Sequence, residues 1–274
     1  MRTQAIKVSL ASAVAVIWLS RPDSQNALDF AMVNSLEATL RELQADNSIR
    51  AIVLAGEGEV FSTGIDAHLL HQMSKASKAA LDKHILATMQ LFRTLDEIGK
   101  PTLARVHGAA RSVALGVIAA CDIAVAAIDA EFSIDETRLG FISAGMLPYL
   151  VRAMGARYAR RYLLSGESFT AADAYRIGLV HELAPPQELD ARINEILGQL
   201  LLAAPKAASM TKKVIAELAL SPTTNAKNSI LAQRTASLMG ANEAKAGVEA
   251  FLKENAPSWA IQSGRKPSRR TRGN

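Results

Sequence analysis

Strand patterns and helix patterns alternate along the first two thirds of this 274-residue chain, and this alternation constrains the fold most strongly. Residues 29–45 carry apolar side chains at helical spacing and lead into a short apolar strand pattern at 51–56. A long amphipathic pattern at 78–98 leads in the same way into a strand pattern at 102–108. Strands separated by helices of this length are usually parallel neighbours. An α/β fold with a largely parallel sheet is therefore predicted.

The sequence patterns before and after these segments, up to about residue 145, predict further strands and helices of the same sheet. A hairpin is predicted from strands at 5–10 and 14–19, and a small-residue helix at 113–120 precedes a strand at 121–127. Beyond that point only 179–183 has an extended pattern. Helices are predicted there at 145–154, 156–163, 171–177, 186–203, 206–219, 225–239 and 242–254.

These patterns divide the chain into an α/β core at 1–195, a helical region at 196–260 and a basic tail at 261–274, which is expected to be disordered. Five positive charges fall in the last ten residues, where there is no acid, so the tail accounts for the whole formal net charge of +5. Such a tail can contact polyanions, but it is more typical of a solubilising terminus. Nucleic acid is therefore not expected as the main partner.

The single cysteine, Cys121, excludes an internal disulfide, and its apolar surroundings indicate an inert packing residue. The apolar stretch at 8–19 is too short to span a bilayer. Arg21 and Pro22 follow it, in place of the small residues of a signal-peptide cleavage site. We expect a cytoplasmic protein with no membrane partner.

Several chemistries have no motif in the sequence. Neither glycine-rich phosphate loop is present, and no G-x-S-x-G nucleophile motif occurs. His68 and His71 lie three residues apart in a loop-like region, but no clear third ligand accompanies them. No metal site is predicted.

Four stretches, in this order and spacing, resemble the crotonase superfamily (enoyl-CoA hydratase/isomerase). They are RPDSQNALD at 21–29, EVFSTGIDAHLL at 59–70, the segment at 104–141 that contains HGAARSVALGVIAACDIAVA, and AGVEAFLKENAPSW at 246–259. The segment at 155–183 also matches the family's pattern, so the resemblance covers about residues 5–260. It implies the crotonase (ClpP-like) fold, a repeated ββα core with a helical C-terminal region.

The resemblance also implies an oxyanion hole, in which two backbone N–H groups hold the thioester oxygen of an acyl-CoA while an enolate forms. By position the donors are Ile65, which follows Gly64 in FSTGID, and Val113, which follows Ser112. The family usually has a glycine pair where Ser112 and Val113 stand. Because valine disfavours positive φ and is branched, the hole is expected to be either reshaped or lost.

Hydratases of this family commonly carry two glutamates beside the substrate. The first position is Gly116 in this chain, so that carboxylate is missing, and the second aligns with Glu136. Glu136 is the predicted acid/base, with its neighbour Asp135 as the alternative. Sites with one glutamate resemble either enoyl-CoA isomerases or hydratases of branched glutaconyl-type CoA esters. The sequence of neighbouring segments is more similar to that of the hydratases.

Coenzyme A is expected only as part of the substrate, with no separate cofactor. The family's pattern places the substrate and its CoA along Ala27, Gly64 and the backbone of Asp66 to His68. Asp23 and His68 replace residues that are often phosphate-binding lysines. The relatives suggest a homotrimer or a dimer of trimers. We thus expect an enoyl-CoA hydratase or isomerase of the kind used in fatty acid metabolism. The alternatives are another enolate chemistry, such as thioester hydrolysis or decarboxylation, or a catalytically silent homologue.

Overall fold

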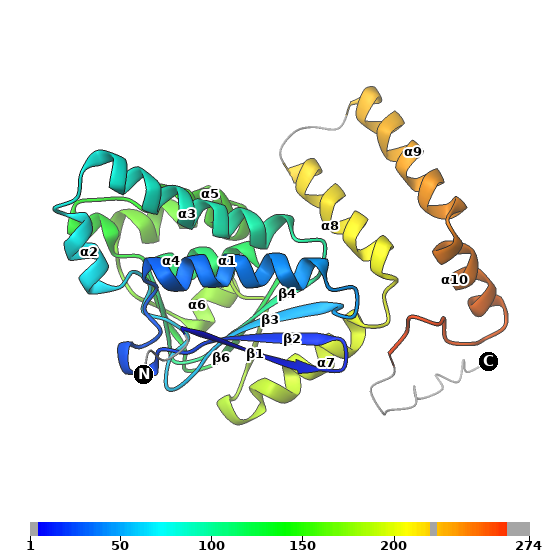
Figure 1. Ribbon diagram of the computed structural model, residues 1–274, viewed down its shortest axis with the longest axis horizontal. Coiled ribbons are helices and arrows are strands. Elements are labelled where there is room, and N and C mark those ends of the chain that lie inside the picture. Colours follow the sequence, from blue (N-terminus) through cyan, green and yellow to red (C-terminus); the bar gives the residue numbers. More distant parts are fainter. Residues whose placement is uncertain (1–4, 220–223, 262–274) are drawn as a thin grey trace.

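A six-stranded sheet forms the centre of the computed structural model, which describes residues 5–219 and 224–261 (Figure 1). Its strand order is β1-β2-β3-β4-β6-β9; β1 and β2 are antiparallel, and every later neighbouring pair is parallel. A second sheet has the order β5-β7-β8. The strands are β1 (Ile6–Ala11), β2 (Val14–Leu19), β3 (Ala51–Gly56), β4 (Thr102–Val106), β5 (Ala109–Arg111), β6 (Ile123–Ala127), β7 (Glu131–Ser133), β8 (Phe169–Thr170) and β9 (Glu182–Ala184).

Helices cover the main sheet and continue into the C-terminal region (Figure 1). The α-helices are α1 (Phe30–Ala45), α2 (Ala67–Met73), α3 (Lys78–Glu97), α4 (Val113–Ala120), α5 (Leu147–Ser165), α6 (Ala171–Arg176), α7 (Leu189–Leu200), α8 (Pro205–Ala219), α9 (Asn225–Gly240) and α10 (Asn242–Leu252). Short 3₁₀ helices lie at η1 (Pro22–Ser24), η2 (Glu136–Leu139), η3 (Ala144–Met146) and η4 (Pro186–Glu188). The structure confirms the predicted α/β core with a helical C-terminal region.

The main sheet is buried on both faces because its strands direct alternate side chains to two cores. Every residue of β3 is buried. Ile52 and Leu54 join the larger core, which includes residues of α1, α3, α4 and α5, while Ala51 and Val53 join a smaller one. The apolar face of α7 closes this smaller core. The two cores fix the carboxyl ends of the strands, from which the loops of the candidate site leave the sheet.

Differences from the predicted elements have local causes. The strand predicted at 102–108 ends at Val106, and Ala109 begins a strand of the second sheet. The strand predicted at 121–127 begins only at Ile123, because the Cys121 N–H donates to the Ile118 carbonyl and the Asp122 N–H donates to the Thr102 hydroxyl. The extended segment predicted at 179–183 is shorter and shifted toward the C-terminus, since β9 covers Glu182–Ala184.

The region around His68, predicted to be loop-like, is the helix α2. Asp66 begins this helix, since its carboxylate accepts hydrogen bonds from the N–H groups of His68 and Leu69 at 2.9 and 3.1 Å. The two helices predicted at 145–154 and 156–163 form the single element α5, with a non-helical break at Gly155.

The C-terminal helices pack little against the core. Helices α8, α9 and α10 contain no buried residue and extend away from the sheet (Figure 1). An ion pair of 2.8 Å joins Lys212 of α8 to Asp122. The predicted boundary between residues 195 and 196 falls inside α7, and the basic tail beyond residue 261 lies outside the described residues. No helix in the described ranges is both long and apolar enough to cross a membrane.

Candidate active site

The candidate site lies where three loops leave the carboxyl ends of neighbouring parallel strands. The loop after β3 carries Gly64 and Ile65, the chain after β4 passes through β5 to Ser112, and the chain after β6 passes through β7 to Glu136. Because β3, β4 and β6 are adjacent and parallel, these loops emerge at one edge of the sheet. The topology therefore gathers residues that are far apart in the sequence.

Gly64 allows the first two loops to touch. Its φ is +82°, and a Cβ at this position would lie 2.3 Å from the Arg111 carbonyl oxygen and 2.5 Å from Ser112 Cβ. Leu28 pairs with this loop, donating its N–H to the Gly64 carbonyl at 2.6 Å and accepting from the Asp66 N–H at 3.1 Å. These bonds leave the Ile65 N–H without a hydrogen bond within the described chain, which fits the donor role predicted for it.

Val113 is the first residue of α4, and its N–H likewise donates no hydrogen bond within the described chain. The positive φ expected to trouble valine lies one residue earlier, at Ser112, with φ 55° and ψ −132°. These are dihedrals that glycine dominates, so a serine there costs on the order of 1–3 kcal/mol. The predicted conflict with a positive φ is therefore absent at Val113 and falls on Ser112, while the branched side chain of Val113 lines the cavity described next.

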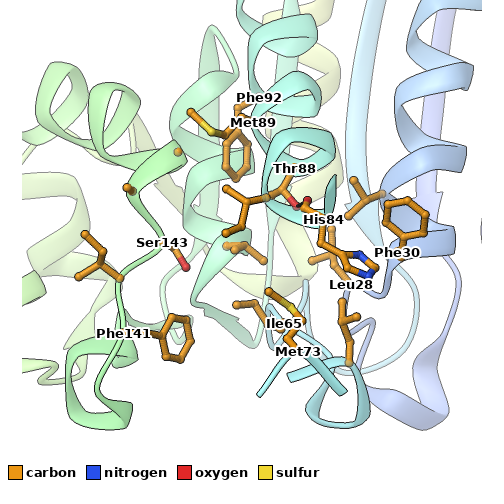
Figure 2. A pocket seen from close by; sticks show the side chains of 17 residues that line it. Leu28, Phe30, Ile65, Met73, His84, Thr88, Met89, Phe92, Phe141 and Ser143 are labelled. Atoms are coloured by element: carbon orange, nitrogen blue, oxygen red, sulfur yellow. Dashed lines mark hydrogen bonds between the residues drawn. The ribbon is translucent and has the colours of Figure 1, made fainter. Parts of the chain in front are cut away.

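Ile65 and Val113 line the same cavity, which has a volume of about 180 Å³ (Figure 2). Its walls are mostly apolar and come from α1, α2, α3, α4 and the segment from Phe141 to Gly145. In Figure 2, His84 and Ser143 lie on opposite sides of this space, with Ile65 between them. The two free N–H groups thus belong to residues that border one apolar space large enough for part of a ligand.

Glu136 lies next to this cavity and is held by two serines. Its side chain is buried, with 3% of the residue exposed, and Oε1 accepts hydrogen bonds from Ser112 Oγ at 2.7 Å and Ser143 Oγ at 2.9 Å. The other oxygen, Oε2, is buried and has no hydrogen-bond partner among the described residues. Glu136 borders a second apolar cavity of about 290 Å³, which shares Ile142 and Ser143 with the first.

The space that the absent glutamate of the family would occupy is filled. A Cβ built on Gly116 would lie 2.6 Å from both Met146 Cβ and Phe92 Cζ. Both residues are fully buried in the core. The chain therefore has one carboxylate at this site, with apolar packing in place of a second.

Replacing Gly116 with alanine is expected to destabilise the fold by about 1–3 kcal/mol, because the added methyl overpacks Phe92 and Met146. Urea unfolding followed by circular dichroism measures this change. Gly240→Ala is the matched control, since nothing lies within 4 Å of a Cβ at the end of α9. Equal stability of the two variants would contradict the filled space at position 116.

The residues predicted to contact CoA have other contacts in this structure. The Ala27 carbonyl accepts from Arg21 at 2.8 Å, and Arg21 also pairs with Asp66 at 3.2 Å. Burial raises the pKa of Asp66, but the backbone N–H groups of Leu69 and His68 together with Arg21 outweigh it and lower that pKa. His68 is exposed on α2 and stays available for a phosphate. The predicted CoA contacts remain predictions.

The hydroxyl groups of Ser112 and Ser143 were missed by sequence reasoning, as were the packing roles of Phe92 and Met146. The sequence indicates Ser112 only as a departure from glycine. Nothing in the sequence connects it to Glu136, 24 positions later. Among the described residues, no group of three His, Cys, Asp or Glu side chains is arranged to hold a metal ion.

Cys121 lies outside the site and is buried. Burial raises the pKa of its thiol to about 12, so almost no thiolate is present at neutral pH. The native protein is expected to react negligibly with a thiol reagent such as dithionitrobenzoate over minutes. Unfolded protein should release one equivalent of chromophore per chain, whereas rapid labelling of the native state would contradict the buried position.

Comparison with known proteins identifies the family. A sequence model described as enoyl-CoA hydratase/isomerase matches residues 9–262. This chain belongs to that family. The crystal structure of an enoyl-CoA hydratase from Shewanella pealeana superposes on this family member with a TM-score of 0.91 at 29% identity, covering 94% of this chain and 97% of that one. The crotonase fold is thereby confirmed.

Relatives of this enoyl-CoA hydratase/isomerase family member differ in activity. A putative enoyl-CoA hydratase from Thermus thermophilus is 31% identical over 90% of this chain and 97% of its own length. The 4-chlorobenzoyl coenzyme A dehalogenase-2 of an Arthrobacter species is 32% identical over 77% of this chain and 78% of its own. Family membership therefore indicates an enzyme of the crotonase superfamily, while the individual reaction has to be argued from the site.

Proposed function

We propose that the protein binds an acyl-CoA thioester between the N–H groups of Ile65 and Val113 and catalyses hydration or isomerisation of an enoyl-CoA. In isomerisation, Glu136 takes a proton from the carbon beside the thioester and returns it to another carbon of the acyl chain. In hydration, it takes the proton from the water that adds to the double bond and gives it to the enolate carbon. The two N–H groups stabilise the enolate oxygen that forms between these steps. No separate cofactor takes part, and CoA enters only as part of the substrate.

The observation that carries this proposal is the state of the Glu136 carboxylate. A buried oxygen without a partner is costly unless a ligand or water meets it. Glu136 accepts a hydrogen bond from the Ser143 hydroxyl through its other oxygen. Ser143 lines the cavity that Ile65 and Val113 also border. Since Gly116 offers no second carboxylate, a single group must both remove and return the proton, which favours isomerisation or a one-glutamate hydration.

Calorimetric titration with acetoacetyl-CoA, an enolate-like ligand, tests the oxyanion hole against titration with free CoA. Tighter binding of acetoacetyl-CoA supports the two N–H donors, and enoyl-CoA substrates of different acyl groups then separate hydration from isomerisation by their products. Equal affinity for both ligands would contradict the proposed oxyanion hole. Absence of binding by either would favour the catalytically silent alternative, and release of free CoA or of carbon dioxide would favour hydrolysis or decarboxylation.

The helices after the core support a further part of the proposal, an assembly of identical chains as a trimer or a dimer of trimers. Large apolar side chains of α8, α9 and α10 are exposed, among them Ile215, Met239 and Phe251. An exposed apolar surface of this kind commonly marks a protein–protein interface. Light scattering measures the assembly, and a monomeric mass would contradict it.

A further inference from the structure

We propose that Ser112 and Ser143 are positioning residues that hold Glu136 through Oε1, so that Oε2 is the atom that exchanges a proton with the substrate. The inference rests on the proposed acid/base role of Glu136 and extends it to the oxygen used and the groups that fix it. Neither serine is assigned a role by the family resemblance.

The hydrogen bonds divide the carboxylate into two unlike oxygens. Oε1 receives both hydroxyl groups, at 2.7 Å from Ser112 and 2.9 Å from Ser143. Two donors on one carboxylate oxygen restrict the rotation of the carboxylate. Oε2 receives none, although it is buried. In this proposal, a ligand that enters beside Ser143 uses Oε2 as its acceptor, because Oε1 already accepts from both hydroxyl groups.

The strained backbone at Ser112 indicates a function for its hydroxyl group. Glycine occupies φ 55° and ψ −132° without penalty, whereas serine is strained there. The Ser112 N–H donates to the Ser133 carbonyl at 2.9 Å, and Gly64 packs against Ser112 Cβ, so its surroundings hold this conformation. A serine at a position suited to glycine is explained if the hydroxyl supplies a contact that glycine lacks.

Ser112 also links the two halves of the site. Its side chain holds Glu136, and the next peptide group along the chain carries the Val113 N–H. The proposed acid/base and one proposed oxyanion donor are thus fixed by one residue at the start of α4. A shift of Ser112 would move both groups together, whereas loss of the hydroxyl alone would release only the carboxylate.

Exchange of Cα protons of butyryl-CoA in D₂O, followed by mass spectrometry, tests the inference in the full chain. This saturated thioester can form an enolate and exchange, but it cannot be hydrated or isomerised. Ser112→Gly and Ser143→Ala are each expected to slow exchange about 10- to 100-fold, the effect of losing a hydrogen bond to a charged group. Acetoacetyl-CoA affinity should change less than about threefold, because the backbone donors remain.

Ser112→Gly separates positioning from structure. Glycine relieves the strained backbone, which offsets the loss of the Ser112 hydrogen bond, so this variant is expected to unfold at about the wild-type urea concentration while exchanging more slowly. Ser143→Thr keeps a hydroxyl and is expected to recover most of the rate lost in Ser143→Ala. Wild-type exchange rates in both Ser112→Gly and Ser143→Ala would overturn the inference alone. Absence of exchange in the wild type, at the level of Glu136→Gln, would overturn the acid/base role of Glu136 as well.

Discussion

Replacing Glu136 with glutamine is expected to lower kcat for the enoyl-CoA substrate by about 10²- to 10⁴-fold, the usual contribution of a positioned acid/base. Glutamine is nearly isosteric and can still accept from Ser112 and Ser143, so the site should keep its shape. Affinity for acetoacetyl-CoA should persist, because the Ile65 and Val113 N–H groups are unchanged. Steady-state kinetics and calorimetry on the same preparations measure both quantities.

Asp135→Asn is the matched control for this prediction. Asp135 is the neighbouring carboxylate, but it is only half-buried and has no hydrogen bond to either serine. Its replacement should leave kcat within about threefold of the wild type, as expected of a group that moves no proton. A large loss in Asp135→Asn combined with an active Glu136→Gln would transfer the acid/base role to the neighbour.

The second large effect is expected from Gly64→Ala. Alanine would be strained at φ +82°, and its Cβ would overlap the Arg111 carbonyl oxygen and Ser112. The loop must move away from α4, which takes the Ile65 N–H out of place. Loss of one oxyanion donor typically lowers kcat by about 10²- to 10³-fold. Acetoacetyl-CoA affinity should fall in parallel, as calorimetry would detect.

Gly140→Ala separates backbone strain from overlap. Gly140 has a similar φ of +85°, but nothing lies within 4 Å of an added Cβ. This control should lose about 1 kcal/mol of stability from the left-handed conformation and retain acetoacetyl-CoA binding. If Gly64→Ala binds acetoacetyl-CoA as tightly as Gly140→Ala, the contact between the two loops is not what places Ile65.

The fold was predictable where a pattern was long and regular. The helix predicted at 78–98 corresponds to Lys78–Glu97, and the strand at 51–56 is confirmed residue for residue, because burial on both faces selects continuous apolar sequence. The small sheet was missed. Its strands β5, β7 and β8 have only two or three residues each, so they are fixed by partners far along the chain and leave no periodic signal.

The candidate site was predictable in part, through motif positions. The structure brings Gly64, Ile65, Val113 and Glu136 together at one edge of the sheet, as the resemblance implied. The contacts that distinguish this chain could not be predicted. The Ser112 hydroxyl reaches a residue 24 positions away, and the space beside Gly116 is filled from α3 and η3. Such contacts depend on tertiary geometry, which a single sequence does not contain.

The lack of buried residues in α9 and α10 has a consequence for how the chain folds. A 16-residue helix is only marginally stable by itself in water, and these two contribute no residue to either core. Contacts between identical chains, if the proposed assembly forms, are therefore expected to stabilise these two helices. By mass action, the helix content of α9 and α10 should rise with protein concentration, whereas the sheet should not respond. Dilution would then unfold α9 and α10 before the sheet, and amide hydrogen exchange at two concentrations would resolve this order.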